Sequence, residues 1–277
     1  MKQEILRIFP DFPDTRLVTY LHQDAPELHA QPHRAVIICP GGGYRFLSER
    51  EAEPVALEFL AAGFQVFILY YGIGSHATNW EPLTEACGAV RYVREHAAEW
   101  NLLPDKIMIA GFSAGGHCAA SCGTLWKHPA VREAFLKWYG DTAVERGRPD
   151  GTILSYPVIT AGPYAHRDSI LALCGAKTAE EAGERGAEYS LECFVDGDTA
   201  PSFLWTTASD ALVPCQNTLL YAMALANAHV PLELHIFPEG AHGLSLADQR
   251  TWCGNPALLS DRATEWIRLA IRWAMEC

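Results

Sequence analysis

Hydrophobic residues gather along this chain in short, nearly continuous runs, and amphipathic stretches separate these runs from one another. Unbroken apolar runs are typical of parallel β-strands whose two faces are both covered. The six runs lie at residues 34–39, 64–71, 106–110, 152–156, 202–207 and 232–237. The last run alternates more than the others, which predicts a strand near a sheet edge. Residues 5–9 and 16–21 predict two further strands, for which we expect antiparallel pairing.

The stretches between the strands have the spacing of helices. Apolar side chains recur every three or four residues from Leu83 to Ala97, which indicates an amphipathic helix. Residues 55–62 form a second helix, which ends at Gly63, a residue type that favours a helix C-terminus. Two more helices are expected at residues 214–228 and 257–275. Strands that alternate with helices predict one α/β domain over 1–277, with a mostly parallel sheet of about eight strands covered by helices on both faces.

One segment interrupts the alternation. Residues 159–200 contain no strong strand pattern and are rich in alanine, glycine and glutamate. We expect short helices and loops there, above the sheet edge and after the sixth strand, where an insert commonly shapes a substrate site. Its apolar residues form only a short cluster, at Ile170, Leu171 and Leu173.

A serine stands between glycines directly after the strand at 106–110. The segment reads GFSAGGH and contains the pattern G-x-S-x-G from Gly111 to Gly115, with Ser113 at its centre. It matches neither the Rossmann nor the P-loop pattern. Between a strand and a helix, G-x-S-x-G is the pattern of a nucleophile elbow, a sharp turn that exposes the serine. The flanking glycines leave room for this turn and for close packing of the strand against the helix.

A nucleophilic serine needs a general base and a carboxylate that orients the base. Asp210 follows the strand at 202–207, and His242 follows the strand at 232–237. The order serine, acid, histidine, with each residue after a strand, is the order that accompanies a nucleophile elbow. We therefore predict a catalytic triad of Ser113, Asp210 and His242.

Several other residues compete for these roles. His117 lies one helical turn after the candidate nucleophile, where a helix carries it away from the direction of attack, so we interpret it as a packed helix residue. Asp196 and Asp198 precede the seventh strand and would lie at its wrong end. His166 and Ser169 either contact substrate or organise the start of a helix, and the sequence leaves both interpretations open.

A glycine triplet in the segment CPGGGY follows the strand at 34–39. Backbone N–H groups that point at a developing negative charge form an oxyanion hole, and glycines let the main chain approach without a Cβ. We assign the donors to Gly42, to Gly43 and to Ala114, the residue after the nucleophile. Tyr44, the next residue of the loop, is a candidate substrate contact, as is His166.

The four segments CPGGGY, GFSAGGH, ASDALVP and EGAHGLSL together resemble the α/β-hydrolase esterases of the acetylesterase and xylan-esterase-like group. The resemblance covers about residues 34–277. It implies the α/β-hydrolase fold and the triad Ser113, Asp210 and His242, but no particular substrate. One departure is Pro40, because lipase loops of the H-G-G-G type carry a histidine there. That histidine is not a triad member, so only the anchoring of the loop must differ.

Composition limits the partners and the compartment. The formal net charge of −12 argues against nucleic acid or a membrane surface as partner, because both require a basic surface. The first residues lack the apolar segment of a signal peptide, and the apolar runs are too short to span a bilayer. Nine cysteines, several in apolar segments, predict free core thiols in a cytoplasmic protein. Cys118 and Cys122 lack a second pair at metal-binding spacing, so we expect no metal, and no cofactor is implied.

The sequence predicts a serine carboxylesterase that forms an acyl-enzyme and hydrolyses short-chain, acetyl-type esters of sugars or other small alcohols. Short acyl groups are expected because the insert offers no broad apolar wall and because Tyr44 and Phe46 are bulky. Two alternatives stay open: a serine exopeptidase or amidase with the same triad, and a ligand-binding hydrolase relative without turnover. The sequence does not decide the alcohol half of the ester or whether the chain forms a homodimer.

Overall fold

The computed structural model describes residues 1–23, 27 and 31–277, and its centre is a sheet with eight strands among these residues. The strands are β1 (Lys2–Leu6), β2 (Arg16–Leu21), β3 (His33–Cys39), β4 (Gln65–Tyr70), β5 (Leu102–Phe112), β6 (Gly151–Ser155), β7 (Ser202–Thr207) and β8 (Leu232–Phe237). Their order across the sheet is β1-β2-β4-β3-β5-β6-β7-β8. The two N-terminal strands pair antiparallel, as does β2 with β4, and all pairs from β4 to β8 are parallel.

All eight predicted strands are present in the structure, but several begin or end at other residues than predicted. β8 lies at the edge of the sheet, as its alternating pattern predicts. β1 ends at Leu6, whereas the prediction extended to residue 9. The chain turns there because the N–H of Phe12 donates to the carbonyl of Phe9, and the Phe9 ring leaves the sheet to pack 5.2 Å from Trp138, centroid to centroid.

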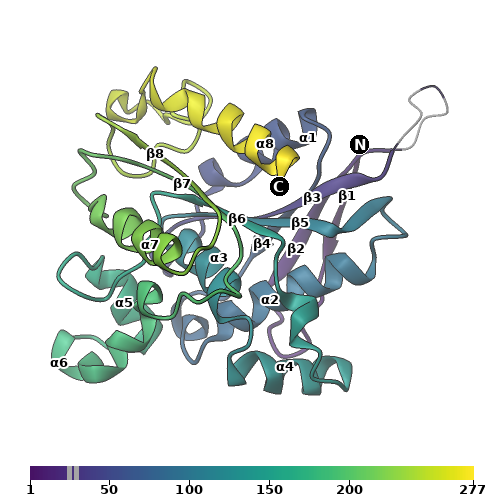
Figure 1. The fold of residues 1–277 in the computed structure, drawn as a ribbon, viewed down its shortest axis with the longest axis horizontal. Helices are drawn as coiled ribbons and strands as arrows, with labels where there is room; N and C mark the ends of the chain where they lie inside the picture. Colours follow the sequence, from purple (N-terminus) through teal and green to yellow (C-terminus); the bar gives the residue numbers. More distant parts are fainter. Residues whose placement is uncertain (24–26, 28–30) are drawn as a thin grey trace.

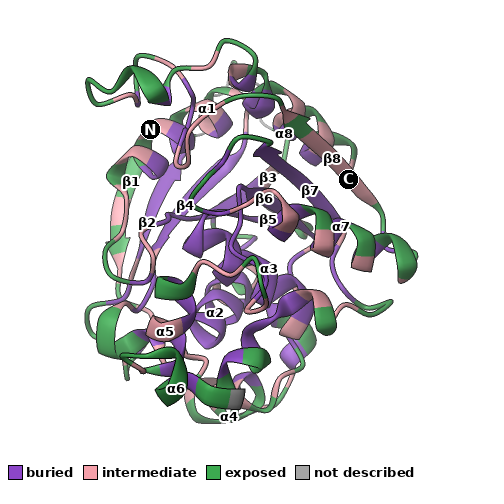
Figure 2. Cartoon of the chain, turned by 90° about the vertical axis from the view of Figure 1, so that its left-hand side faces the viewer, coloured by how far each residue is buried: buried purple, intermediate pink, exposed green. Residues whose placement is uncertain are grey.

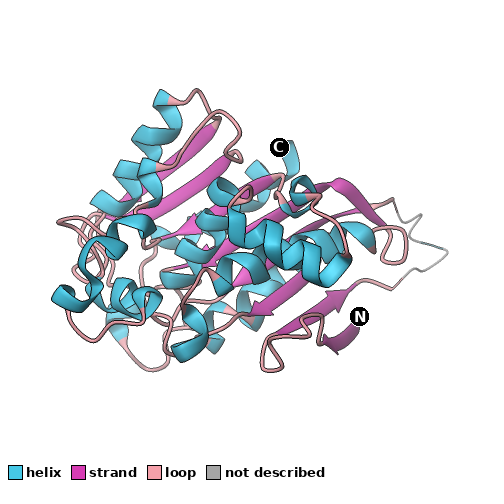
Figure 3. Cartoon of the chain, turned by 90° about the horizontal axis from the view of Figure 1, so that it is seen from below, coloured by secondary structure: helices cyan, strands magenta, loops and turns pink. Residues whose placement is uncertain are grey.

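Helices cover both faces of the sheet (Figure 1). They are α1 (Glu53–Ala61), α2 (Glu81–Glu95), α3 (Ala114–Leu125), α4 (Pro129–Tyr139), α5 (Arg167–Cys174), α6 (Ala179–Ala182), α7 (Gln216–Asn227) and α8 (Trp266–Glu276). Apolar residues of α1 and α8 pack into one core cluster, and those of α2, α3 and α7 pack into another on the opposite face. Figure 3 shows helices of one of these layers in front of the strands. Within the described residues, none of the helices combines the length and hydropathy that a membrane crossing requires.

One helical prediction needs correction, and one helix of the structure was not predicted. The expected helix over 257–275 is broken into the short 3-10 turns η7 (Pro256–Leu258) and η8 (Ala263–Glu265), and only α8 is a regular helix. Ser260 causes the break, because its N–H donates to the carbonyl of Ala247 while its hydroxyl accepts from the N–H of Ala263. The helix α4 was not predicted. One helix, α3, was expected between β5 and β6, whereas the structure has two there.

The insert at 159–200 contains helices and loops without a strand among its described residues, as predicted. It comprises α5, α6 and the 3-10 segments η5 (Gly183–Tyr189) and η6 (Leu191–Cys193). A cavity of about 520 Å³ lies between α5, α6 and η5. Figure 2 shows α6 largely exposed, whereas the central strands and α3 are buried.

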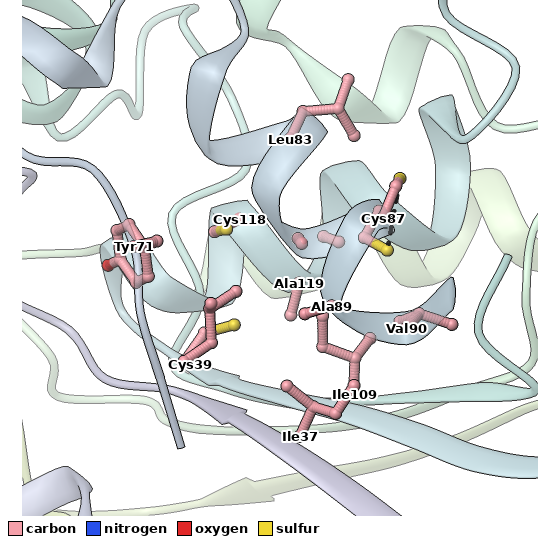
Figure 4. Close-up of a cluster of buried hydrophobic side chains, with 14 of the residues drawn as sticks. Ile37, Cys39, Tyr71, Leu83, Cys87, Ala89, Val90, Ile109, Cys118 and Ala119 are labelled. Atoms are coloured by element: carbon pink, nitrogen blue, oxygen red, sulfur yellow. Dashed lines mark hydrogen bonds between the residues drawn. The ribbon is translucent and has the colours of Figure 1, made fainter. Parts of the chain in front are cut away.

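The core cluster on the face of α2 and α3 contains a group of thiols, of which Figure 4 labels Cys39, Cys87 and Cys118. Cys39 on β3, Cys118 on α3 and Cys87 on α2 are all buried, and the Sγ atoms of Cys87 and Cys122 are 3.5 Å apart. All nine cysteines are free. Cys118 and Cys122 therefore serve as small packing residues between the helices and the sheet.

Candidate active site

Ser113 occupies the turn between β5 and α3. Its backbone has φ 55° and ψ −117°, a conformation that residues with a side chain rarely adopt and that is common where function requires strain. Its N–H donates to the carbonyl of Ser155 (3.0 Å), and its carbonyl accepts from the N–H groups of His117 (3.1 Å) and Val158 (2.9 Å). These hydrogen bonds to the end of β6, to the segment after it and to α3 hold the strained turn in place.

The two glycines of the G-x-S-x-G pattern are required by close approach of the backbone. A Cβ on Gly111 would lie 2.1 Å from the carbonyl oxygen of Gly115, and a Cβ on Gly115 would lie 2.1 Å from the carbonyl oxygen of Cys39. Any side chain at either position would push α3 away from β3 and β5. The predicted close packing of strand against helix is therefore confirmed.

The structure brings Ser113, His242 and Asp210 together in one chain of hydrogen bonds. The Oγ of Ser113 lies 2.7 Å from Nε2 of His242, and Nδ1 of His242 lies 2.7 Å from Oδ2 of Asp210. The three residues follow β5, β8 and β7, and the carboxyl ends of these parallel strands meet at one edge of the sheet. With the proton of a neutral imidazole on Nδ1, Nε2 is free to accept the serine proton.

Asp210 is held on its other oxygen as well. Its Oδ1 accepts hydrogen bonds from the N–H groups of Leu212 (3.0 Å) and Val213 (2.9 Å), and only 6% of its surface is exposed. This fixed carboxylate can orient the histidine. The two competing acids stand elsewhere, since Asp196 accepts from the N–H of Asp198 in the loop before β7, and Asp198 forms an exposed ion pair with Lys127.

The glycine loop that follows β3 passes directly beside the serine. Gly42 and Gly43 have φ of 138° and 64°, which favour glycine. A Cβ on Gly41 would lie 3.0 Å from Cβ of Ser113. The loop is anchored at Pro40, whose carbonyl accepts a hydrogen bond from Oη of Tyr71 at 2.7 Å. The loop, which lacks the histidine of the H-G-G-G type, is therefore anchored by Tyr71.

Tyr44 does not line the site, so its prediction as a substrate contact is wrong for the side chain. The residue is fully buried, and its Oη lies 2.9 Å from Nδ1 of His117. The Nε2 of His117 lies 3.0 Å from the carbonyl of Tyr189. Burial lowers the pKa of His117 to about 4, so the ring is neutral and can accept from Tyr44 while donating to Tyr189. The interpretation of His117 as a packed helix residue is confirmed.

His166 faces the glycine loop from the insert. A Cβ on Gly43 would lie 3.9 Å from Cε1 of His166 and 4.0 Å from Oγ of Ser169, and the His166 Nδ1 is 2.8 Å from that Oγ. His166 precedes α5, yet its side chain makes no capping hydrogen bond. Burial and the nearby His242 hold the pKa of His166 below its ordinary value, which favours a neutral ring beside the triad.

Sequence reasoning missed three residues that surround the hydrogen-bonded serine, histidine and aspartate: Arg50, Glu51 and Tyr156. The first two belong to the 3-10 segment η2 (Glu49–Glu51), directly after the glycine loop. Glu51 and Tyr156 are both buried. The signal in the sequence is weak, because the run SEREAE between the loop and α1 reads as an ordinary solvated segment.

Fold and site define the class. An eight-stranded, mostly parallel sheet covered by helices, with a serine elbow after β5, an aspartate after β7 and a histidine after β8, is an α/β hydrolase. The model of the BD-FAE family matches residues 24–225, and the chain belongs to this family.

Similar proteins carry related names. Endo-1,4-beta-xylanase B of Butyrivibrio fibrisolvens is 37% identical over 241 residues, which are 86% of this chain and 36% of that protein. An acetylxylan esterase of Xylanibacter ruminicola is 30% identical over 85% of this chain and 45% of that protein. The chain thus spans less than half the length of these curated relatives. The solved structure of an acetyl ester-xyloside bifunctional hydrolase from Caldicellulosiruptor lactoaceticus is 32% identical, covers 99% of this chain and 96% of that chain, and has a TM-score of 0.79.

Proposed function

We propose that this protein is a serine carboxylesterase that hydrolyses short-chain esters through Ser113, His242 and Asp210. The observation that carries the proposal is the continuous hydrogen-bond chain, with 2.7 Å between Ser113 and His242 and 2.7 Å between His242 and Asp210. The names of the similar proteins support it, since they include an acetylxylan esterase and an acetyl ester hydrolase.

In the proposed acylation step, His242 takes the proton of Ser113 at Nε2 as Oγ attacks the acyl carbon. Asp210 stabilises the imidazolium and keeps Nδ1 protonated. The carbonyl oxygen gains negative charge and is received by the N–H groups of Gly42, Gly43 and Ala114. Ala114 is the first residue of α3, so its N–H has no carbonyl partner within that helix.

The tetrahedral intermediate then collapses in the usual way for this chemistry. The bond from the acyl carbon to the alcohol oxygen breaks, and His242 returns its proton to that oxygen. The acyl group stays on Ser113 as an ester. A water molecule, deprotonated by His242, attacks this acyl-enzyme, and the carboxylic acid leaves with Ser113 restored.

The proposed substrates are acetyl-type esters of sugars or other small hydroxyl-bearing alcohols. His166 lies next to Gly43, and its Nδ1 is hydrogen-bonded to Ser169. Its other ring nitrogen, Nε2, is the group that would form a hydrogen bond with a hydroxyl next to the ester. The names of the similar proteins contain acetylxylan and xyloside, so acetylated xylosides and short fragments of acetylated xylan are one such class.

A comparison of substrates tests the proposal. Wild-type protein is assayed with nitrophenyl acetate and with aminoacyl nitroanilides at equal concentrations. We expect hydrolysis of the ester and little of the anilide, together with covalent labelling of Ser113 by an organophosphonate. Faster cleavage of the anilide would favour an exopeptidase or amidase, and labelling without turnover of either substrate would favour a ligand-binding relative.

We further propose that the protein acts in the cytoplasm. The support is chemical: nine free cysteines, two of them exposed, persist best in a reducing compartment. A small carbohydrate ester that enters the cell would then be the substrate, rather than a polymer outside it.

A further inference from the structure

Glu51 is a buried acidic residue that contacts the glycine loop at Gly41. Only 3% of its surface is exposed. Its Oε2 accepts a hydrogen bond from the N–H of Gly41 at 2.9 Å, and its Oε1 accepts from Oη of Tyr156 at 2.7 Å. A buried carboxylate is costly unless hydrogen bonds satisfy its oxygens, so these two donors fix where it lies.

Tyr156 connects this carboxylate with the proposed base. Its Oη also accepts from the N–H of Ser245, three residues after His242, at 2.9 Å. Its ring packs edge-on against the imidazole of His242, with centroids 5.1 Å apart and an interplanar angle of 72°. Burial raises the pKa of Tyr156 well above its ordinary value, as does the Glu51 carboxylate. The phenol therefore stays protonated and donates a hydrogen bond to Glu51.

Gly41 is closely packed, so a shift of Glu51 would move the glycine loop. A Cβ on Gly41 would lie 2.7 Å from Oε2 of Glu51 and 3.0 Å from Cβ of Ser113. The space that a side chain on Gly41 would need is therefore filled by the Glu51 carboxylate and by Ser113. The N–H groups of Gly42 and Gly43, which we assign to the oxyanion, follow within two residues, so the carboxylate limits where they stand.

Arg50 holds the other loop of the site. Its Nη2 donates to the carbonyl of Gly243 at 2.6 Å, and its Nε donates to the carbonyl of Thr251 at 2.5 Å. Its own carbonyl accepts from Oγ of Ser245 at 2.5 Å. Two adjacent residues of η2 therefore contact both the glycine loop and the loop that carries His242.

We propose that Glu51 is a positioning residue that sets the oxyanion donors relative to the general base. It acts through the N–H of Gly41 on one side and through Tyr156 on the other. The inference rests on the proposed esterase function. Misplacement of donors or base by a fraction of an ångström weakens transition-state stabilisation more than substrate binding. Glu51 should therefore affect kcat and leave KM nearly unchanged.

The test compares Glu51→Gln and Tyr156→Phe with a matched control. Glutamine keeps the shape but has only one acceptor oxygen, so it cannot accept from both Gly41 and Tyr156. Phenylalanine keeps the ring against His242 and removes the hydroxyl. The control is Glu53→Gln, because Glu53 also accepts from a tyrosine, Tyr20, at 2.9 Å, but does so away from the triad.

We expect each of the two site variants to lower kcat for nitrophenyl acetate by about 10- to 100-fold, with KM within about threefold of wild type. The double variant should be little slower than the slower single variant, because both remove one connection. Organophosphonate labelling of Ser113 should slow by a similar factor, and Glu53→Gln should match wild type. Circular dichroism establishes the temperature at which every variant is folded.

The inference is overturned if both site variants keep the wild-type kcat, if their effects add, or if Glu53→Gln loses as much activity. Should Glu51→Gln fail to fold, the kcat of Tyr156→Phe decides alone, because that variant keeps the packing of the ring. Failure of the esterase proposal gives a different result: Ser113→Ala then retains wild-type hydrolysis, or wild-type protein hydrolyses no ester.

Discussion

The Nε2 of His242 lies 2.7 Å from the Oγ of Ser113, although 129 positions separate the two residues in the chain. Two further strands, β6 and β7, stand between the strands that carry them. The contact exists because the loop after β8 returns over the sheet edge, where Arg50 and Tyr156 hold it at Gly243 and Ser245. The position of His242 therefore depends on residues outside β8, namely Arg50 in η2 and Tyr156 directly after β6.

Removal of either member of this pair should abolish most activity. Ser113→Ala and His242→Ala should each lower kcat for nitrophenyl acetate by about 10⁴-fold or more, and the double variant should be hardly worse, because the residues act as a unit. Ser75→Ala, an exposed serine, serves as the control. Wild-type turnover by Ser113→Ala, or phosphonate labelling at another serine, would contradict the assignment.

Asp210→Asn should lower kcat strongly, by about 10⁴-fold, while the protein stays folded. An asparagine can still accept from the N–H groups of Leu212 and Val213, but it does not stabilise an imidazolium on His242. Initial rates and circular dichroism separate activity from folding. The matched variant Asp198→Asn should keep full activity, and a reversal of the two results would identify the acid before β7 instead.

His166→Ala should affect the alcohol half of the substrate more than the acyl half. We expect its KM for an acetylated xyloside to rise about 10-fold, because a hydrogen bond to a hydroxyl is lost. Its kinetics on nitrophenyl acetate, which lacks hydroxyls, should change by less than about twofold. Equal losses on both substrates would show that His166 supports the glycine loop rather than the alcohol.

The sequence predicts the fold well, because most parallel strands reveal themselves as unbroken apolar runs and each candidate residue follows a strand. It also predicts the glycines at 111 and 115, where the backbone leaves no room for a Cβ. It fails for Tyr44, whose ring leaves the loop to reach His117, a contact between residues 73 positions apart. It fails likewise for Glu51, which looks like one more surface charge until Gly41 and Tyr156 are seen to surround it.

Glu85 should make the stability of the fold depend on pH. This carboxyl of α2 is buried and accepts from the N–H of Gly72 at 2.6 Å and from Oγ1 of Thr15 at 2.5 Å. Burial raises its pKa to about 8, whereas an unfolded glutamate has a pKa of about 4.3. Between these values the folded state keeps a proton that the unfolded state releases. Stability contributed by Glu85 is therefore complete below about pH 4.3 and is lost as the pH rises toward 8.

Glu85→Gln removes this titration. We expect the fall in melting temperature from pH 5 to pH 8 to be smaller in the variant than in wild type by about 3 °C or more. Scanning calorimetry or thermal circular dichroism at four pH values measures it. Glu99→Gln, an exposed glutamate near the same helix, should follow the wild-type slope. Parallel slopes for wild type and Glu85→Gln would show that Glu85 does not hold a proton in this range.

The acyl group should be short. The residues that face the glycine loop from the insert are polar, since His166 and Ser169 both lie about 4 Å from a Cβ placed on Gly43. Each added CH₂ gains about 0.8 kcal/mol only where an apolar wall receives it. We therefore expect kcat/KM to be highest for acetyl to butyryl esters and to fall by octanoyl.

A series of nitrophenyl esters from two to twelve carbons measures this preference. Phe46→Ser tests the expectation that the bulk of this exposed ring limits the acyl chain, and the optimum should then move toward longer chains in the variant. A longer chain would instead need the cavity of about 520 Å³ between α5, α6 and η5, which Ile170 and Leu171 line. An optimum at eight carbons or more that disappears in Leu171→Ser would show that the acyl chain enters this cavity, and the protein would then act as a lipase.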